Sequence, residues 1–156
     1  MRPTFWFKNQ PVRAAGVILW TYRNGRIVRL LRKVNNLIED IGGKTDDGDK
    51  DIIDTVVREV AEETNGKLFS EYHSYEDCMN CMYHIINNYN VHYNVQYNPR
   101  SKYLLYRVFV DPSILALSMK RFGLYEKTEW GILRHYYKWT YLIPRNLHPR
   151  LKNISI

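Results

Sequence analysis

The stretch that decides the fold lies in the first half of the chain, where residues 43–66 read GKTDDGDKDIIDTVVREVAEETNG. A glycine and a loop rich in carboxylates lead into apolar residues at helical spacing, and an Asn-Gly pair ends the pattern. Asp49 or Asp51 can cap this helix by accepting backbone N–H bonds. Acidic residues in the first turn suit the helix dipole. We therefore predict a helix over about residues 50–64.

The predicted helix has two chemically distinct sides. Its apolar residues share one stripe: Ile53, Val57, Val60 and Ala61. Its glutamates share the opposite side: Glu59, Glu62 and Glu63. Like charges three or four residues apart repel each other, and a solvated acidic face is the ordinary explanation of such a triplet. Divalent cations relieve this repulsion, because Mg²⁺ binds a few carboxylates and completes its shell with water and substrate phosphates.

Charge is divided unevenly along the chain. The net charge is +7. Residues 1–38 hold 8 basic and no acidic side chains, and residues 39–63 hold 10 acidic and 3 basic ones. Residues 100–156 are again basic, with 11 basic and 3 acidic side chains. A basic surface favours polyanionic partners, whereas the acidic block favours hard cations, so together they predict cations and a phosphate-bearing substrate.

Residues 43–66 resemble the Nudix box of Nudix hydrolases, G-x5-E-x7-R-E-U-x-E-E-x-G-U with U aliphatic. The core of the pattern, Arg58 to Glu63, matches without departure. Gly43 is in place and Asp49 stands where the first Glu belongs, although the spacing to Arg58 is one residue longer. Gly66 also arrives one residue late. The similarity extends to residues 13–19, which match the first core strand of the family.

The resemblance implies an α/β (α+β) fold, namely a Nudix-type α/β/α sandwich with a mixed β-sheet and a catalytic loop-helix-loop. The chain would be a single domain spanning residues 1–156. The implied activity is Mg²⁺- or Mn²⁺-dependent hydrolysis of a nucleoside diphosphate linked to another moiety. The implied metal ligands are Glu59, Glu62 and Glu63, with Asp49 as a further candidate. Arg58 would orient a carboxylate of the helix, and Gly43 would let the loop backbone approach the site.

The general base has more than one candidate. Glu63 can serve, but members of the family also recruit a glutamate from a later loop. Glu126 and Glu129 are the only acidic residues after Asp111, and either can face the metals or be an ordinary exposed loop charge.

The rest of the chain alternates strand and helix patterns, and no composition break divides it. Residues 17–22 and 26–34 predict a hairpin around Asn24-Gly25. Further predicted elements are a helix over 78–88, a strand over 103–110, a helix over 113–122, and a strand or short helix over 130–142.

Two weaker patterns have ordinary structural explanations. Cys78 and Cys81, with His73 and His84 nearby, have the spacing of half a zinc site, but reduced thiols packed on a helix are the more common arrangement. Basic and aromatic residues alternate over 134–152, including Arg134, Lys138, Arg145, Arg150, Lys152, Tyr136, Tyr137, Trp139 and Tyr141. They could hold phosphates and stack bases, or the aromatics could face the core while the basic tips are solvated. Arg23, Arg26, Arg29, Arg32 and Lys33 on the first hairpin could likewise steer an anionic substrate or only keep the protein soluble.

These patterns leave two substrate classes open. A free nucleotide needs only a small pocket, whereas a capped or triphosphorylated RNA 5′ end would use the basic flanks to hold its backbone. A non-catalytic Nudix-fold module that binds a nucleotide or RNA is a third alternative. No apolar run approaches the ~20 residues of a membrane-spanning helix, and two cysteines favour a reducing compartment. The expected location is the cytoplasm, or the host cytoplasm if the source is viral, since 13 Asn and 13 Tyr indicate an AT-rich coding sequence.

Overall fold

The fold is built around a long hairpin near the N-terminus. In the computed structural model, which describes residues 1–88, 94–115, 122–128, 131–141 and 145–152, the strands are β1 (Phe5–Phe7), β2 (Gln10–Val12), β3 (Ala14–Arg23), β4 (Arg26–Val34), β5 (Leu37–Glu39), β6 (Ile41–Lys44), β7 (Val95–Asn98), β8 (Tyr103–Phe109), β9 (Phe122–Thr128) and β10 (Gly131–Thr140). The helices are α1 (Ile52–Glu63) and α2 (Tyr75–Asn88), and η2 (Pro112–Ile114) and η3 (Pro149–Leu151) are single 3₁₀ turns.

The predicted hairpin is confirmed as β3 and β4, which pair antiparallel through Arg23 and Arg26. Asn24 and Gly25 form the turn with positive φ values of 53° and 72°. This two-residue turn matches the twist of the flanking strands, which explains why an Asn-Gly pair is so strong a hairpin signal.

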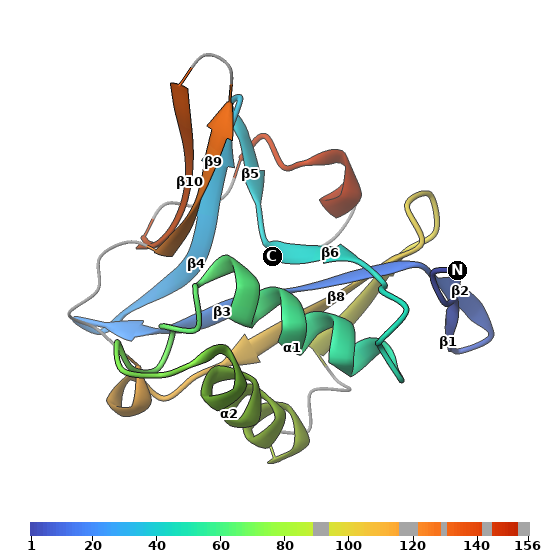
Figure 1. Ribbon diagram of the computed structural model, residues 1–156, viewed down its shortest axis with the longest axis horizontal. Coiled ribbons are helices and arrows are strands. Elements are labelled where there is room, and N and C mark those ends of the chain that lie inside the picture. Colours follow the sequence, from blue (N-terminus) through green and yellow to red (C-terminus); the bar gives the residue numbers. More distant parts are fainter. Residues whose placement is uncertain (89–93, 116–121, 129–130, 142–144, 153–156) are drawn as a thin grey trace.

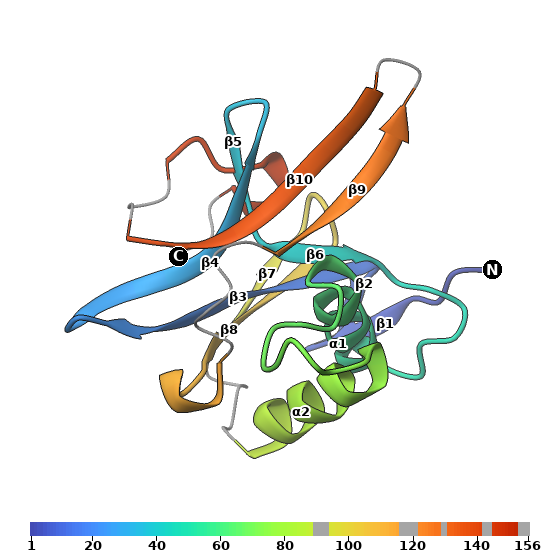
Figure 2. The same cartoon turned by 60° about the vertical axis from the view of Figure 1, so that its left-hand side comes forward.

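The main sheet is mixed and forked. Its strand order is β7-β8-β3-β4-β10-β9, and β3 runs parallel to β8 while the other neighbours are antiparallel. Along one edge, β3 pairs first with β6 and then, beyond Leu19, with β4. β5 pairs with the far end of β4. The β4-β5 arm therefore diverges from β3 and β6, as the arrangement of these strands in Figures 1 and 2 shows.

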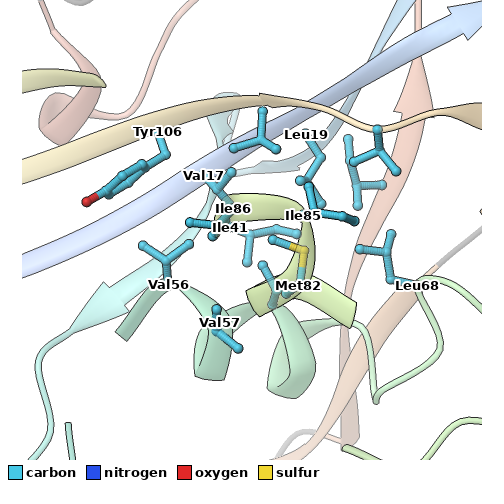
Figure 3. Packing of buried hydrophobic residues seen from close by; sticks show 14 of the residues in the cluster. Val17, Leu19, Ile41, Val56, Val57, Leu68, Met82, Ile85, Ile86 and Tyr106 are labelled. Carbon is cyan, nitrogen blue, oxygen red and sulfur yellow. The ribbon is translucent and has the colours of Figure 1, made fainter. Parts of the chain in front are cut away.

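Both described helices lie on one face of this sheet (Figures 1 and 2). Alternate residues of β3, including Val17 and Leu19, point into the same cluster as Val56 and Val57 of α1. Figure 3 shows this cluster together with side chains from α2: Met82, Ile85 and Ile86. Each of these side chains is nearly or fully buried, and burial of this kind contributes roughly 1.5–3 kcal/mol per large apolar side chain.

The opposite face of the sheet carries a smaller cluster, formed by Ile18, Leu31, Tyr103, Leu105 and Leu151. Leu147 and Leu151 belong to the C-terminal segment 145–152, which covers this part of the sheet. The α+β class with a mixed sheet is therefore confirmed. Among the described residues, the covering layer on this second face is the segment 145–152 with its turn η3 rather than a helix.

Several other elements were predicted with shifted bounds. The predicted helix over 78–88 is α2, which begins earlier because Ser74 and Asp77 exchange side chain to backbone hydrogen bonds of 3.1 Å in a capping arrangement. The strand over 103–110 is β8, and the element over 130–142 is the strand β10.

The predicted helix over 113–122 is wrong where the structure describes it. Only the turn η2 forms, because Leu115 after it is already extended, and Phe122 begins β9. Residues 116–121 lie outside the described residues. Asp111 accepts a hydrogen bond from the backbone N–H of Ser113, which is a start signal for a helix, but the apolar Leu115 turns toward the core instead of continuing the helix. None of the described helices is long and apolar enough to cross a membrane.

Candidate functional site

The helix predicted over about residues 50–64 is confirmed as α1, and this helix carries the candidate site. Asp51 caps its N-terminus by accepting a 3.0 Å hydrogen bond from the backbone N–H of Asp54. At the C-terminal end, Asn65 and Gly66 both adopt positive φ, and the N–H of Gly66 donates a 2.7 Å hydrogen bond to the carbonyl of Ala61. The chain thus leaves the helix at the predicted stop.

The three glutamates of α1 are not on a uniformly solvated face. Side-chain exposure is 11% for Glu59 and 14% for Glu63, but 45% for Glu62. α1 packs on β3 and β6, with Val56, Val57, Val60 and Ala61 buried, whereas Ile53 is only half-buried. Because the sheet is forked beside α1, two of the glutamates extend into the molecule instead of into solvent.

Glu59 lies directly against the backbone of β6. A Cβ atom placed on Gly43 would come within 2.3 Å of Glu59 Oε1. Glycine is therefore the residue that leaves room for this carboxylate.

Arg58 links the acidic loop to the helix. Its Nη1 lies 3.1 Å from Glu59 Oε1 and 3.6 Å from Glu62 Oε2, which confirms the expected pairing one turn on. Its Nη2 donates to the carbonyl of Lys44 at 3.0 Å and to Asp49 Oδ2 at 3.0 Å. The guanidinium therefore fixes two carboxylates of the helix relative to the loop.

Asp49 serves as the anchor of Arg58. It accepts hydrogen bonds from Arg58 Nε at 3.2 Å, Thr55 Oγ1 at 2.7 Å and the backbone N–H of Asp46 at 2.9 Å. Burial opposes ionisation of Asp49, but the hydrogen bonds from Arg58 and Thr55 outweigh it and lower the pKa. Both oxygens of Asp49 are occupied in this way, so the geometry favours a positioning role over the role of a metal ligand.

Arg32 of β4 was named from the sequence only as one of the basic residues of the hairpin, and the structure places it beside the glutamates of α1. Its Nε donates to Glu39 Oε2 at 2.6 Å, and its Nη1 lies 3.6 Å from Glu63 Oε2. Glu39 in turn lies 3.8 Å from His148 Nε2. The alternation along β4 places Arg32 on the same face as Leu30, toward α1, but only the fork of the sheet brings it to Glu63.

Burial and mutual repulsion disfavour the charged forms of the glutamates. Burial, together with the charges of Glu62 and Glu63, raises the pKa of Glu59 to about 7 although Arg58 opposes the change. Burial also raises the pKa of Glu63, against the nearby Arg32. Glu63 Oε2 is buried without a hydrogen-bond partner in the part of the chain that the structure describes, which is uncommon for a buried polar atom.

In the part of the chain that the structure describes, no three acidic, His or Cys side chains are grouped closely enough to hold a metal ion as they stand. The donor set nevertheless fits a hard divalent cation, because carboxylate oxygens are the ligands that Mg²⁺ and Mn²⁺ prefer. Glu63 Oε2, which has no hydrogen-bond partner among the described residues although Arg32 Nη1 lies 3.6 Å away, is an acceptor available for such a role. The residues that could hold the cation are Glu59, Glu62 and Glu63.

The other candidate residues have different outcomes. Glu126 lies in β9 opposite Leu133, but its side chain and the whole of Glu129 lie outside the described residues. Cys78 is buried in the core and Cys81 is half-buried, both as free thiols, and His84 contacts Asn88. The described residues thus favour packed thiols over a zinc site.

The basic and aromatic residues of the segment 134–152 lie in different environments. Tyr137 and Trp139 are buried in the core. Arg150 forms a 2.7 Å ion pair with the buried Asp40, so its guanidinium is engaged inside the protein and is not a solvated tip. Lys138 is exposed.

No family model and no curated protein matches the chain. A search of solved structures finds similarity to the crystal structure of Ap4A hydrolase from C. elegans. The two chains are 15% identical, the match covers 83% of this chain and 80% of that chain, and the TM-score is 0.41.

Proposed function

We propose that this protein is a metal-dependent Nudix hydrolase that cleaves a diphosphate linkage in a nucleotide-derived substrate. The substrate would be a nucleoside triphosphate or a nucleoside diphosphate linked to another moiety. The observation that carries the proposal is the pair of largely buried glutamates, Glu59 and Glu63, which two arginines hold on the helix of the Nudix box.

The energetic cost of this arrangement supports a functional role. Burying a carboxylate is unfavourable unless it is fully paired. Arg32 Nη1 lies 3.6 Å from Glu63 Oε2, but this oxygen accepts no hydrogen bond from the described residues. Perturbed pKa values that arise from burial and like charges are typical of functional sites. A helix with a purely structural role could bury apolar side chains at these positions at lower cost.

Different residues of the site would position the carboxylates, bind the cation and take a proton. Arg58 holds Glu59 and Glu62 in one orientation and is itself held by Asp49, while Arg32 holds Glu63. Glu59, Glu62 and Glu63 would bind the divalent cation, which supplies neutralisation of phosphate charge and acidification of a water molecule. Glu63, whose Oε2 accepts no hydrogen bond from the described residues, is our candidate to take the proton of the attacking water. Glu126 and Glu129 remain the alternatives for this step.

The test is an assay of the purified protein with Mg²⁺ or Mn²⁺ against nucleoside triphosphates, dinucleoside polyphosphates, nucleotide sugars, and capped or triphosphorylated RNA. We expect a metal-dependent product that Glu63→Gln reduces by about 10²-fold or more. Glu71→Gln is the matched control, because Glu71 is exposed and outside the box.

A second readout does not depend on turnover. Addition of Mn²⁺ should raise the melting temperature of the wild type, since a ligand that binds only the folded state stabilises it, and Glu63→Gln should lose most of this shift. Absence of both a metal-dependent product and a metal-dependent stabilisation would contradict the enzyme and favour a non-catalytic module. Metal-dependent stabilisation without turnover of any compound would also contradict the proposed activity.

A further inference from the structure

A second cluster of aromatic and basic side chains lies on the sheet face opposite α1 and α2. In the register of the sheet, Trp20 of β3 lies between Arg29 of β4 and Phe109 of β8. The adjacent rows pair Tyr22 with Ile27 and Ile18 with Arg107. Side chains two residues apart along a strand point to the same face. Ile18 belongs to the small cluster on the second face, so the other members of these rows share that face.

The three aromatic rings of this surface pack against one another. The ring centroids of Trp20 and Phe109 are 4.9 Å apart, those of Trp20 and Tyr22 are 5.7 Å apart, and those of Tyr22 and Phe109 are 6.0 Å apart. Contacts between the rings hold them as a preformed unit. Tyr22 is 49% exposed and Ile27 is 42% exposed, so the unit is accessible at the hairpin end of the sheet. We call these residues, together with Arg29 and Arg107, the Trp20 surface.

A cavity of about 220 Å³ opens on the Trp20 surface. It is lined by Ile18, Trp20, Ile27, Arg29, Asn94 and Arg107. The C-terminal segment covers the neighbouring part of this face through Leu147 and Leu151, and these residues are not among those that line the cavity. The lining therefore combines apolar and aromatic side chains with two arginines and an amide.

The charge of the cavity is not balanced by the described residues that line it. No acidic side chain is among these described residues. The Nε of Arg107 is buried and has no hydrogen-bond partner among the described residues, and a buried donor without an acceptor costs free energy. An anionic group placed in this cavity would balance the charge of Arg29 and Arg107, which makes a phosphate-bearing ligand the complementary one.

We propose that the Trp20 surface binds single-stranded nucleic acid, with bases stacked on the exposed aromatic rings and backbone phosphates held by Arg29 and Arg107. Single strands are recognised by this combination of aromatic faces and cationic side chains on a sheet surface. Residues 1–38, which contribute Trp20, Tyr22 and Arg29, hold 8 basic and no acidic side chains. The surface lies on the face of the sheet opposite α1, so its binding does not depend on the proposed hydrolase site.

The experiment measures fluorescence anisotropy of a labelled single-stranded RNA of about 12 nucleotides, with EDTA present to prevent hydrolysis. Dissociation constants are determined over a series of salt concentrations for the wild type and for three variants. These are Tyr22→Ser, which removes an exposed ring, Ile27→Glu, which adds a repelling charge at an exposed position, and the double variant Arg29→Gln/Arg107→Gln.

The surface predicts different effects for these variants. Tyr22→Ser should weaken binding at least about fivefold, the lower end of the loss of one stacked base, and Ile27→Glu should weaken it further. The arginine double variant should reduce the slope of log affinity against log salt concentration by about 1.4, which is about 0.7 for each lost phosphate contact. Circular dichroism checks that each variant is folded. Because Tyr22 and Ile27 are exposed, their variants still test the proposal if the arginine variant unfolds.

Two controls separate this surface from general attraction and from the catalytic helix. Arg100→Gln removes a charge that lies outside the Trp20 surface, among the residues of a separate cavity, and it should leave the affinity within about twofold of wild type. Glu63→Gln should bind the RNA as well as wild type even if it lacks all hydrolase activity. Three results would each overturn the proposal. The first is an equal loss of RNA affinity in Arg100→Gln and Tyr22→Ser, and the second is an affinity for duplex RNA equal to that for the single strand. The third is full competition by a mononucleotide at the same concentration as the strand.

Discussion

At the scale of single residues, Gly43 is the position where the absence of a side chain matters most for the candidate site. A Cβ there would come within 2.3 Å of Glu59 Oε1 and 2.6 Å of Glu59 Cδ. We predict that Gly43→Ala displaces the carboxylate, destabilises the fold by about 1–3 kcal/mol through overpacking, and weakens binding of Mn²⁺. Chemical denaturation and metal titration measure the two effects.

Gly48→Ala is the matched control, because a Cβ on Gly48 has no atom within 4 Å. It should leave the stability and metal affinity near those of wild type. If the two alanine variants behaved alike, the close approach of Gly43 to Glu59 would have no energetic consequence.

The two cysteines differ in environment although they are one helical turn apart. Burial raises the pKa of the Cys78 thiol to about 11, while Cys81 is half-buried. We predict that iodoacetamide at pH 8 modifies Cys81 first and reaches Cys78 only on unfolding, because the thiolate is the reactive form. Mass spectrometry of digested protein identifies the modified residue.

The same thiol gives a pH dependence of stability. The folded state keeps the proton of Cys78 to a higher pH than the unfolded state, whose thiol titrates at the ordinary value of 9.0. The contribution of Cys78 to the free energy of unfolding should therefore fall as pH rises from about 9 to about 11. A Cys78→Ala variant should lack this component, and an unchanged pH profile in that variant would contradict the assignment.

At the scale of elements, the end of α1 depends on one glycine. Gly66 has a φ of +73°, and a Cβ there would come within 2.9 Å of the carbonyl oxygen of Ser74. Gly25 in the hairpin turn has a nearly equal φ of +72° but nothing within 4 Å. Comparison of the two positions therefore separates backbone strain from steric contact.

We predict that Gly25→Ala costs about 1–2 kcal/mol, the cost of placing an L-residue in the left-handed region. Gly66→Ala should cost more, because it adds a clash to the same strain and disturbs the connection from α1 to α2. Urea unfolding of both variants gives the comparison, and a smaller loss for Gly66→Ala would contradict this account of the helix end.

At the scale of the whole molecule, a buried ion pair fastens the C-terminal segment to the fork of the sheet. Asp40, which connects β5 to β6, accepts hydrogen bonds from Arg150 Nη2 at 2.7 Å, Arg150 Nε at 3.0 Å and the hydroxyl of Tyr103. The hydroxyl of Tyr137 donates to the backbone carbonyl of Asp40 at 2.9 Å. Four segments that are distant in sequence therefore meet at one aspartate.

We predict that Arg150→Met destabilises the protein by about 3–5 kcal/mol, because it leaves Asp40 charged and buried without its partner. The double variant Asp40→Asn/Arg150→Met should recover part of that loss, since the remaining group is neutral and still has Tyr103 as a partner. A double-mutant cycle by chemical denaturation measures the coupling. Additive effects of the two substitutions would contradict the idea that the pair acts as a unit.

Local patterns in the sequence predicted the elements that local interactions control. The hairpin around Asn24-Gly25 and the bounds of α1 follow from turn and cap residues whose hydrogen bonds span a few positions. The prediction of a helix over 113–122 was wrong at the two ends that the structure describes. The start signal at Asp111 is equally satisfied by a single 3₁₀ turn. The path of the chain beyond such a turn depends on packing and not on the turn residues.

By itself, the sequence determined that Glu59, Glu62 and Glu63 share one helix, that Arg58 can reach Glu62, and that Gly43 precedes them with a spacing one residue longer than that of the Nudix box. Only the tertiary structure decided that Glu59 and Glu63 are largely buried, that Arg32 pairs with Glu63, and that Arg150 is used internally. The physical reason is the distance along the chain over which each interaction acts. Helical spacing fixes which side chains are neighbours within one turn, but burial and ion pairs across the fork form only when the strands β4, β5 and β6 are in place. The charge of each residue was therefore known from the sequence, but its partner was known only from the fold.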